Sequence, residues 1–408
     1  MLLDNTLTIL LAGGRGARLE PLTADRAKPA VPFGGKYRVI DFTLSNCLHS
    51  GLRRILVLTQ YKSHSLQKHL RDGWSIFNAE CGDFITVVPP QMRTGSSWYS
   101  GTADALFQNL FLLERSEASR VLILAADHIY RMDYAALLKA HEEKAADLTV
   151  ACMRVPVEEA RRAFGVMATD ADERILEFQE KPEEPKPIPG DPDSALASMG
   201  IYVFAIDRLR EALAEDHERN DSSHDFGQDV IPRLIGTHKV YAYRFGGTRG
   251  RVTPDRYWRD VGTLDAYYEA NMDLLKASPP LDLYQRDWAI RTYHAQNPPA
   301  RMVPGPDGKD GLLANSILGS GTVIDGGVVR HSILAARVHV HEDAVVEDAL
   351  LFDNVTVGAG ARLRRCIVDK GVKIPPGETV GIDPAKDAAR FKRSEKGVVV
   401  VPKDYRFG

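Results

Sequence analysis

The chain has 408 residues, of which 44% are hydrophobic and 26% are charged, and its formal net charge is −3. This length predicts at least two domains, and the composition is that of an ordinary globular protein. The charge excludes a strongly basic nucleic-acid-binding protein, and no apolar run approaches the roughly 18 residues that a membrane-spanning helix needs.

Short apolar runs alternate with amphipathic stretches in the first part of the chain. Buried strands are predicted at residues 7–12, 54–59, 121–125, 148–153 and 200–204, and helices at 103–115 and 134–146. This alternation predicts an α/β domain over residues 1–275, with a Rossmann-like, mostly parallel sheet and helices on both faces. Active-site residues are then expected at the carboxyl ends of strands.

A glycine-rich segment, LAGGRGARL at residues 11–19, follows the first strand directly. Its glycines let the backbone N–H groups approach a phosphate, and its two arginines add positive charge. It lacks the Gly-Lys-Ser/Thr of a Walker A motif and the spacing of a dinucleotide-binding motif. The segment therefore predicts a phosphate-binding loop, and the alternative is a simple turn with solvated arginines.

Three ionisable residues follow in motifs of their own. Lys28 suits a phosphate but is by itself also an ordinary surface lysine. Asp127 follows a buried strand, where an Asp is either a Mg²⁺ ligand or the N-cap of a helix, and Asp260 offers the same choice. Two carboxylates that met in space would repel each other unless a cation lay between them.

The pair Glu180-Lys181 precedes a proline-rich loop at residues 182–192. Lys181 could neutralise a sugar phosphate and Glu180 could accept hydrogen bonds from sugar hydroxyls, whereas the alternative is an exposed charged loop. A second stretch rich in proline and glycine, 297–311, predicts that residues 276–311 form a linker.

Beyond the linker, apolar residues recur at steps of roughly six, with Gly, Asp and Asn between them. Ordinary hairpins would instead alternate every second residue. The repeat predicts a left-handed parallel β-helix over residues 312–408. Its flat faces are suited to oligomerisation and regulation.

Taken together, the motifs resemble those of bacterial ADP-glucose pyrophosphorylases, the glucose-1-phosphate adenylyltransferases. The resemblance runs from about residue 8 to about residue 400. It is carried by LAGGRGARL at 11–19, RAKPA at 26–30, FGGK at 33–36, DFTLSN at 41–46, TQY at 59–61, WYSGTADA at 98–105, DHIY at 127–130, FGVM at 164–167, EKP at 180–182, ASMG at 197–200, SHDFG at 223–227 and YWRDVGT at 257–263.

The resemblance implies the conversion of ATP and glucose 1-phosphate to ADP-glucose and pyrophosphate, which commits glucose to glycogen synthesis. The implied catalytic residues are Arg18, Lys28 and Asp127, with Mg²⁺ held by Asp127 and Asp260. The implied nucleotide-binding residues are Gly13, Gly14, Arg15, Gly16, Gln60 and Gly101. The implied glucose 1-phosphate-binding residues are Tyr99, Gly165, Glu180, Lys181, Ser198 and Asp225. Trp98 would lie on a loop that the family couples to activation.

The resemblance also implies an allosteric homotetramer, activated by a sugar phosphate and inhibited by a nucleotide or phosphate. The effector site would lie between the two domains, at Arg26, Arg38, Arg115 and Lys370; the alternative for each is a solvated surface charge. The chain departs from relatives at Asp25, where a Lys or Arg is common, and at Pro32, where some carry His. Because an Asp repels a phosphorylated effector, these departures favour a sugar phosphate other than fructose 1,6-bisphosphate.

Three other functions compete with this interpretation. The first is a pyrophosphorylase that uses UTP or dTTP, and the second is a non-catalytic regulatory subunit of the same fold. The third adds an acyltransferase in the β-helix, for which His331, His339 and His341 are the candidates, although ordinary surface histidines are the simpler explanation.

The cellular compartment is predicted from two features. The four cysteines, Cys47, Cys81, Cys152 and Cys366, are scattered without metal-site spacing, and the N-terminal residues lack the basic region and cleavage site of a signal peptide. Both features favour the reducing cytoplasm, with no nucleic acid and no membrane as partner.

Overall fold

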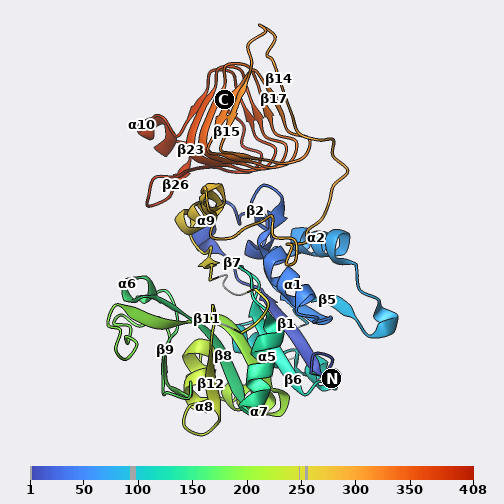
Figure 1. Ribbon diagram of the computed structural model, residues 1–408, viewed down its shortest axis with the longest axis vertical. Helices are drawn as coiled ribbons and strands as arrows, with labels where there is room; N and C mark the ends of the chain where they lie inside the picture. Colours follow the sequence, from blue (N-terminus) through green and yellow to red (C-terminus); the bar gives the residue numbers. More distant parts are fainter. Residues whose placement is uncertain (1, 92–97, 248, 253–255) are drawn as a thin grey trace.

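The computed structural model describes residues 2–91, 98–247, 249–252 and 256–408. An α/β domain forms one end of the molecule and a β-helix is stacked on it, as Figure 1 shows. An extended segment without helices or strands leads from the last short helix of the α/β domain to the first strand of the β-helix.

Four parallel strands form one side of the main sheet, in the order β5-β4-β1-β6, with β5 at the edge. They are β1 (Thr6–Ala12), β4 (Arg54–Thr59), β5 (Phe84–Val88) and β6 (Arg120–Ala125). From β1 the chain passes to β4 on one side and later returns to β6 on the other side. The carboxyl end of β1 is therefore the point where the strand order reverses, which is where open α/β sheets bind ligands.

The sheet continues beyond β6 with strands of mixed direction. The strand β11 (Ser194–Ala205) runs antiparallel to β6 and to β8 (Leu148–Pro156), and β12 (Val240–Arg244) lies parallel to β8. The antiparallel pair β9 (Val166–Thr169) and β10 (Ile175–Gln179) closes that edge. The predicted α/β sheet is thus confirmed, with its parallel strands concentrated around β1.

Helices cover both faces of this sheet. Alternate residues of β1 point to opposite faces: Leu7 and Ile9 pack in one apolar cluster with α3, α4 and α7, and Leu10 packs in another with α1, α2 and α5. The helices are α1 (Val39–His49), α2 (His64–Trp74), α3 (Thr102–Phe107), α4 (Leu110–Glu114), α5 (Tyr134–Glu143), α6 (Val157–Ala160), α7 (Ile206–His217), α8 (Ile231–Leu234), α9 (Leu264–Met272) and α10 (Pro384–Ala388). Short 3₁₀ or π turns lie at Ala17–Leu19, Lys28–Ala30, Ala79–Cys81, Phe226–Val230 and Asp273–Leu275.

The helix predicted over residues 103–115 is two helices in the structure. Asn109 separates α3 from α4, and its side-chain amide donates to the Ala105 carbonyl and to the Tyr99 hydroxyl. Asparagine side chains compete in this way with backbone hydrogen bonds, which is why they interrupt helices.

Two small two-stranded sheets lie outside the main sheet. The strand β13 (Trp258–Asp260) pairs antiparallel with β7 (His128–Tyr130), and β2 (Pro32–Phe33) pairs with β3 (Tyr37–Arg38). The first of these joins a late segment of the α/β domain to the end of β6.

The second domain is the predicted left-handed parallel β-helix. Successive coils pair in register, with Val323 opposite His339 and His339 opposite Thr356, so that one coil takes about 17 residues. One face consists of β14 (Arg301–Val303), β17 (Val323–Asp325), β20 (His339–Val340), β22 (Thr356–Val357) and β24 (Lys373–Ile374). The other faces consist of β15 (Leu312–Ala314), β16 (Ile317–Leu318), β18 (Val328–Arg330), β19 (Ile333–Leu334), β21 (Val345–Leu351), β23 (Arg362–Val368), β25 (Thr379–Val380), β26 (Lys392–Arg393) and β27 (Val399–Val401).

The β-helix begins earlier than the apolar repeat indicates. The strand β14 pairs with β17, although it lies within residues 276–311, which were predicted as a linker. Its side chains are largely exposed at the end of the coil stack, with Met302 47% exposed.

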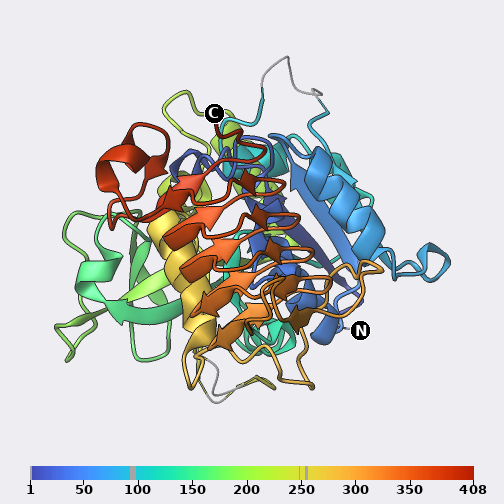
Figure 2. The same cartoon turned by 90° about the horizontal axis from the view of Figure 1, so that it is seen from above.

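The two domains share an apolar interface. Outward-facing residues of one β-helix face, including Ile333, Leu350 and Ile367, are buried in the same cluster as Phe33 and Tyr267 of the α/β domain. Figure 2 shows α9 lying along the stacked coils. The Tyr268 hydroxyl of α9 donates to the Asp348 carbonyl over 2.7 Å. The domains are therefore packed against each other rather than joined only by their connecting segment.

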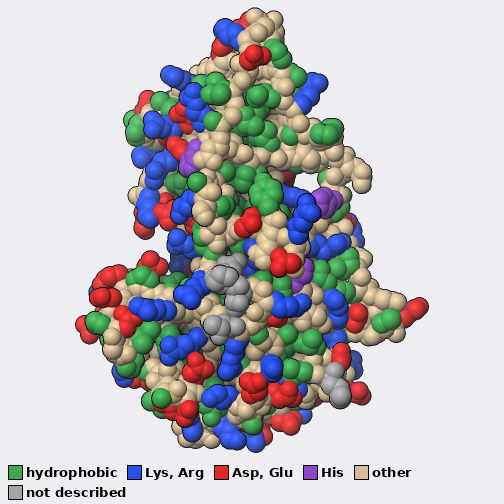
Figure 3. Space-filling model, in the orientation of Figure 1, with side chains coloured by type: hydrophobic (Ala, Val, Ile, Leu, Met, Phe, Trp, Pro, Cys, Tyr) green, Lys and Arg blue, Asp and Glu red, His purple; other side chains and the backbone are tan. Residues whose placement is uncertain are grey.

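The surface carries charges of both signs. Figure 3 shows basic and acidic side chains interspersed over the α/β domain, without a continuous basic area on this face. Within the described part of the chain, every helix is too short or too polar to cross a membrane.

Candidate active site

The glycine-rich loop lies at the carboxyl end of β1. Gly16 has φ +65°, a backbone conformation that favours glycine, and its carbonyl accepts a hydrogen bond from the Thr23 hydroxyl over 2.8 Å. Arg15 and Arg18 are exposed on this loop. A Cβ added at Gly13 would lie 3.2 Å from Cβ of Gln60, so the loop and the end of β4 are closely apposed.

Lys28 meets both aspartates that were predicted as metal ligands. Its Nζ lies 2.8 Å from Oδ2 of Asp127 and 2.9 Å from Oδ1 of Asp260. The Lys28 side chain is 9% exposed, whereas those of Asp127 and Asp260 are 32% and 26% exposed. Residues distant in sequence thus form one ionic group, hereafter the Lys28 cluster, which opens toward solvent on its acidic side.

The topology explains how the Lys28 cluster forms. Asp127 follows β6, the parallel neighbour of β1. The pairing of β13 with β7 sets Asp260 opposite His128, the residue next to Asp127. Neither aspartate is a helix N-cap in the structure, so the alternative considered from sequence does not hold.

Electrostatic contacts keep the Lys28 cluster charged. Burial opposes the charge on Lys28, but the Asp127 and Asp260 carboxylates outweigh it and raise the pKa of the ammonium. Burial also opposes the charge on Asp127, yet the Lys28 ammonium prevails and lowers the pKa of this carboxyl to about 2. Both groups are therefore ionised at neutral pH.

The donor set of the Lys28 cluster fits a magnesium ion. Two carboxylates share one ammonium, and carboxylate oxygens are the ligands that Mg²⁺ prefers in proteins. Arg18 adds a second cation beside them: a Cβ at Gly262 would lie 2.9 Å from Oδ2 of Asp260 and 3.1 Å from a guanidinium nitrogen of Arg18. Gly262 is thus the residue that allows Arg18 and Asp260 to approach each other.

A second group of predicted residues surrounds Glu180. A Cβ at Gly165 would lie 2.9 Å from its Oε2, and one at Gly227 would lie 2.4 Å away, so the carboxylate sits between two glycines. The Ser198 amide donates to the Gly165 carbonyl over 2.7 Å. These residues come from the end of β10, the start of β9, β11 and the 226–230 turn, and the fold brings them together.

Asp225 lies at the start of that turn and is tied to the segment after Gly101. Its Oδ1 accepts from the backbone N–H groups of Gly227 and Gln228, and its Oδ2 accepts from the Thr102 hydroxyl over 3.0 Å. A Cβ at Gly101 would lie 2.2 Å from the His224 carbonyl oxygen, so only glycine fits there.

Lys181 differs from the other predicted sugar-site residues because it is exposed. Its side chain is 58% exposed, and its Nζ lies 2.9 Å from Oε1 of Glu180. The ammonium is therefore paired with the Glu180 carboxylate and faces solvent, where an anion can reach it.

Tyr99 links the end of β4 to the start of α4. Its carbonyl accepts from the Gln60 side-chain amide over 3.3 Å, and its hydroxyl accepts from Asn109 over 3.0 Å. Trp98, the neighbouring residue, is 56% exposed. The segment 92–97 that precedes it lies outside the described residues.

Three of the four predicted effector residues meet at the domain interface. Arg26 donates to Oδ1 of Asp369 over 2.9 Å, and Lys370 lies 2.7 Å from Oδ2 of Asp353. Burial lowers the pKa of Arg38, and burial together with repulsion from Arg38 lowers that of Lys370 to about 8. Arg26 is thus buried and paired with Asp369, and the half-buried Lys370 is paired with Asp353. Arg38 is also half-buried and donates to the Ala30 carbonyl over 3.3 Å.

Arg115 is not part of this group. It follows α4 in the α/β domain, and its guanidinium lies 5.7 Å from the centre of the Phe111 ring. Asp25 directly precedes Arg26 in sequence, but its carboxylate lies beside Lys403, with 3.9 Å between Nζ and Oδ2.

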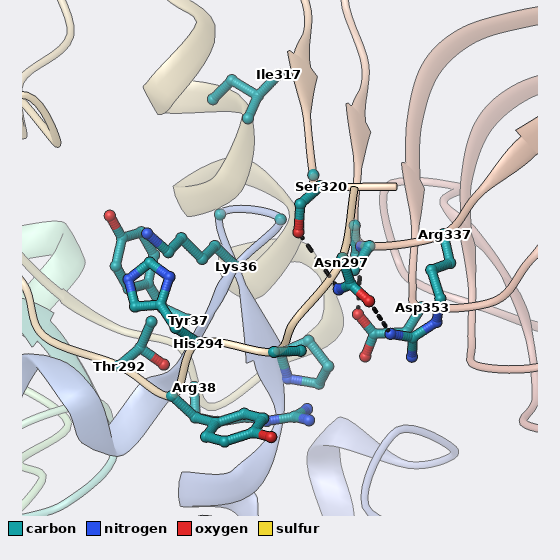
Figure 4. A pocket seen from close by; sticks show the side chains of 18 of the residues that line it. Lys36, Tyr37, Arg38, Thr292, His294, Asn297, Ile317, Ser320, Arg337 and Asp353 are labelled. Atoms are coloured by element: carbon teal, nitrogen blue, oxygen red, sulfur yellow. Dashed lines mark hydrogen bonds between the residues drawn. The ribbon is translucent and has the colours of Figure 1, made fainter. Parts of the chain in front are cut away.

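A cavity of about 720 Å³ adjoins the interface. It is lined by the 34–38 segment, by Thr292 and His294 of the connecting segment, and by β-helix residues that include Asp353 and Lys370. Figure 4 shows Asn297 hydrogen-bonded to both Ser320 and Arg337 at its border. None of the residues of the Lys28 cluster lines this cavity, so it is separate from the site at the end of β1.

Sequence reasoning missed several residues that position the site. Gly262 and Gly227 leave room for charged side chains, and the Thr102 hydroxyl donates to Asp225. His128 Nε2 lies 3.6 Å from Oδ1 of Asp127, and its Nδ1 is buried without a partner among the described residues. The sequence offered two signals for the glycines. Gly262 ends the RDVG motif, and Gly227 ends the Asp-Phe-Gly motif. His128 gave none, because a histidine after an aspartate is unremarkable in sequence.

A strand-order reversal, a glycine-rich loop at the end of β1 and an ionic cluster of two aspartates and a lysine are the features expected of a nucleotidyltransferase. The Nucleotidyl transferase family matches residues 7–277, and a hexapeptide family described as GlmU-like, C-terminal matches residues 298–401. The chain belongs to the glucose-1-phosphate adenylyltransferase family of nucleotidyltransferases.

The relatives match along almost their whole length. Glucose-1-phosphate adenylyltransferase 2 of Vibrio cholerae is 62% identical over 99% of this chain and 99% of its own. The glucose-1-phosphate adenylyltransferase of Paramagnetospirillum magneticum is 50% identical over 98% and 94% of the two chains. That of Rhodopirellula baltica is 51% identical over 98% and 90%.

Proposed function

We propose that this enzyme transfers the adenylyl group of ATP to glucose 1-phosphate, giving ADP-glucose and pyrophosphate. The observation that carries the proposal is the Lys28 cluster at the switch point of the sheet, beside a glycine-rich loop and within a chain 62% identical to a curated glucose-1-phosphate adenylyltransferase. No described feature favours the alternatives that use UTP or dTTP or that lack catalysis.

This reaction does not need a strong general base. The nucleophile is a phosphate oxygen that already carries negative charge, so the enzyme has to align two anions and neutralise their repulsion. Arg18 and Lys28 are suited to the triphosphate and the leaving pyrophosphate, and the backbone of Gly13, Gly14 and Gly16 lies where it can approach the phosphates. The exposed Arg15 adds charge at the mouth of the loop.

Asp127 and Asp260 would hold Mg²⁺, which supplies positive charge to the phosphates when bound. Lys28 balances part of the negative charge of the two carboxylates while the site is without the ion. The Lys28 ammonium lies next to both aspartates. This position supports a role for Lys28 in binding phosphate, in addition to a structural role.

The sugar phosphate is assigned to the Glu180 group. Glu180 offers carboxylate oxygens to sugar hydroxyls, and the exposed Lys181 offers a cation to the phosphate. Ser198, Gly165 and Asp225 shape the pocket through the contacts described above. Gln60, at the end of β4, donates to the Tyr99 carbonyl and is assigned to the nucleotide, as is Gly101, which lies against the turn that begins at Asp225.

We further infer allosteric control and a homotetramer. Arg26 is buried and Arg38 and Lys370 are half-buried at the domain interface, and together they are suited to an anionic effector such as a sugar phosphate, a nucleotide or phosphate. Arg115 could join them only from another subunit or by rearrangement. Four cysteines that are free, three of them buried, support a reducing cytoplasmic location.

The test is pyrophosphate release from purified enzyme with glucose 1-phosphate, Mg²⁺ and either ATP, UTP or dTTP. ATP should be preferred by a wide margin in kcat/KM. A preference for UTP or dTTP would replace the adenylyl assignment by another nucleotidyl transfer. An absence of turnover with every nucleotide and effector would favour the regulatory subunit.

A further inference from the structure

The β-helix carries a group of metal-ligating side chains far from the Lys28 cluster. Asp325, His339 and His341 offer one carboxylate oxygen and two imidazole nitrogens, all within 4.8 Å of one another. They lie on the face that contains β17 and β20, and Figure 1 shows β14 and β17 well away from the α/β domain. Neither nucleotidyl transfer nor the effector group uses them.

The repeat of the β-helix builds this arrangement. His339 and His341 flank Val340, which is buried in the coil interior, so both imidazoles project outward from the same face. Ile324 of the preceding coil pairs with Val340, and the same register sets Asp325 beside His341. The three ligands therefore come from two adjacent coils. The pairing of β17 with β20 fixes the backbone that carries them.

The distances between the donor atoms suit a small divalent ion. His339 Nε2 lies 3.1 Å, and His341 Nδ1 lies 3.3 Å, from the same oxygen of Asp325, Oδ2. The ligand atoms of a tetrahedral zinc ion, bonded at about 2.0–2.2 Å, lie about 3.3–3.6 Å apart. Small side-chain rotations are enough to admit the ion.

Hydrogen bonding alone leaves the group incompletely satisfied. The other oxygen of Asp325, Oδ1, is buried and has no partner among the described residues. The two imidazole rings lie with their centroids 4.0 Å apart, and both direct a nitrogen at a single carboxylate oxygen. A shared cation would satisfy both nitrogens and the carboxylate at once.

We propose that Asp325, His339 and His341 bind one divalent transition-metal ion of the zinc class, which fastens two coils of the β-helix together. Two imidazoles and one carboxylate favour Zn²⁺, Co²⁺ or Ni²⁺ over Mg²⁺, whereas the all-oxygen set of Asp127 and Asp260 suits Mg²⁺. The site holds three protein ligands and leaves at least one coordination position to water.

The test uses the full-length enzyme, stripped of metal and titrated with Co²⁺ in the presence of excess Mg²⁺. Wild type should bind one more Co²⁺ per chain than His339→Gln/His341→Gln, and the visible Co²⁺ absorption of that extra ion should be absent from the double variant. Asp325→Asn should weaken the binding of this extra Co²⁺ ion by at least about tenfold. Bound Zn²⁺ should also raise the Tm of wild type but not of the double variant.

The matched control is His331→Gln. His331 is another histidine of the β-helix paired with an aspartate, with 2.6 Å between its Nδ1 and Oδ1 of Asp348, but it has no second imidazole beside it among the described residues. This variant should bind Co²⁺ like wild type, and circular dichroism should show that all variants are folded. The proposal would be overturned if wild type and the double variant bound the same number of Co²⁺ ions per chain. It would also be overturned if His331→Gln lost as much bound Co²⁺ as the double variant.

Discussion

At the scale of single residues, the site depends on charges held at short range. Lys28 contacts two aspartates that are far apart in sequence, and burial makes each of these charges dependent on its partner. Composition and spacing identified Lys28, Asp127 and Asp260 only as candidates, because each has an ordinary structural explanation in its own segment. Their meeting at one point could not be predicted from local pattern, since it depends on the pairing of β13 with β7.

Asp127 gives the most direct test at this scale. Asp127→Asn keeps the shape of the side chain but removes the negative charge that would hold Mg²⁺. We expect kcat at saturating substrates to fall by about 10²-fold or more, the scale of losing one contact that stabilises transition-state charge. Steady-state pyrophosphate release measures this. Asp72→Asn, which alters an exposed Asp paired with Lys68, should leave kcat unchanged; activity near wild type in Asp127→Asn would remove Asp127 from catalysis.

Lys181 tests whether the Glu180 group binds glucose 1-phosphate rather than ATP. Lys181→Ala removes an exposed ammonium beside Glu180 and should raise KM for glucose 1-phosphate by about tenfold or more, while KM for ATP stays nearly constant. The control is Lys186→Ala, because Lys186 is an exposed lysine of the same loop that pairs with Glu177. A change in the ATP KM instead would show that Lys181 is assigned to the wrong substrate.

At the scale of elements, periodicity predicted the existence of strands better than their direction or ends. The strand at 54–59 has the bounds expected, and β1 and β6 differ by one residue. The antiparallel direction of β11 and the break between α3 and α4 follow from tertiary pairing and from the Asn109 side chain, neither of which leaves an apolar signal. The first coil of the β-helix was also missed. It lies at the end of the stack and exposes residues that inner coils bury.

Gly262 tests how the turn after β13 positions the site. A methyl group at this position would lie 2.9 Å from Asp260 and 3.1 Å from Arg18, which is closer than unstrained contacts allow. Gly262→Ala should therefore displace one of these charges and lower kcat by about tenfold or more, with little change in Tm. The comparison is Gly247→Ala, where the nearest atom to the new methyl group would be 3.5 Å away. Equal activity in both variants would mean that the placement of Arg18 and Asp260 around Gly262 is unimportant for catalysis.

At the scale of the whole molecule, the interface couples the domains through apolar packing and through buried ion pairs. Arg26, Arg38 and Lys370 were predicted from resemblance alone, and they meet only because the β-helix docks on the α/β domain. The pairing of Arg26 with Asp369 and of Lys370 with Asp353 was not foreseen, since no local pattern connects these residues. An anionic effector would have to compete with these two carboxylates.

Lys370 gives this interface a pH dependence. Its pKa is lowered to about 8, first by burial and then by the nearby Arg38, although Asp353 opposes the shift. The ammonium is therefore largely present at pH 7 and is lost as the pH rises through 8, so the affinity for a phosphate-bearing effector should fall between pH 7.5 and 9. Effector titrations of activity at several pH values measure this.

Two variants separate Lys370 from other titrating groups. Lys370→Gln should weaken effector binding and flatten its pH dependence, whereas Lys370→Arg should keep the binding and also flatten the dependence, because a guanidinium stays charged. A pH dependence that persists in both variants would assign the titration to another group.

The account as a whole rests on attack by glucose 1-phosphate at the α-phosphorus of ATP. The most direct measurement follows the two ends of ATP separately, with [α-³²P]ATP in one reaction and [γ-³²P]ATP in the other, each with glucose 1-phosphate and Mg²⁺. The α label should appear in the sugar nucleotide and the γ label in pyrophosphate, both only when the sugar phosphate is present. Transfer of the γ label to the sugar, or release of the α label as free AMP without a sugar nucleotide, would contradict it.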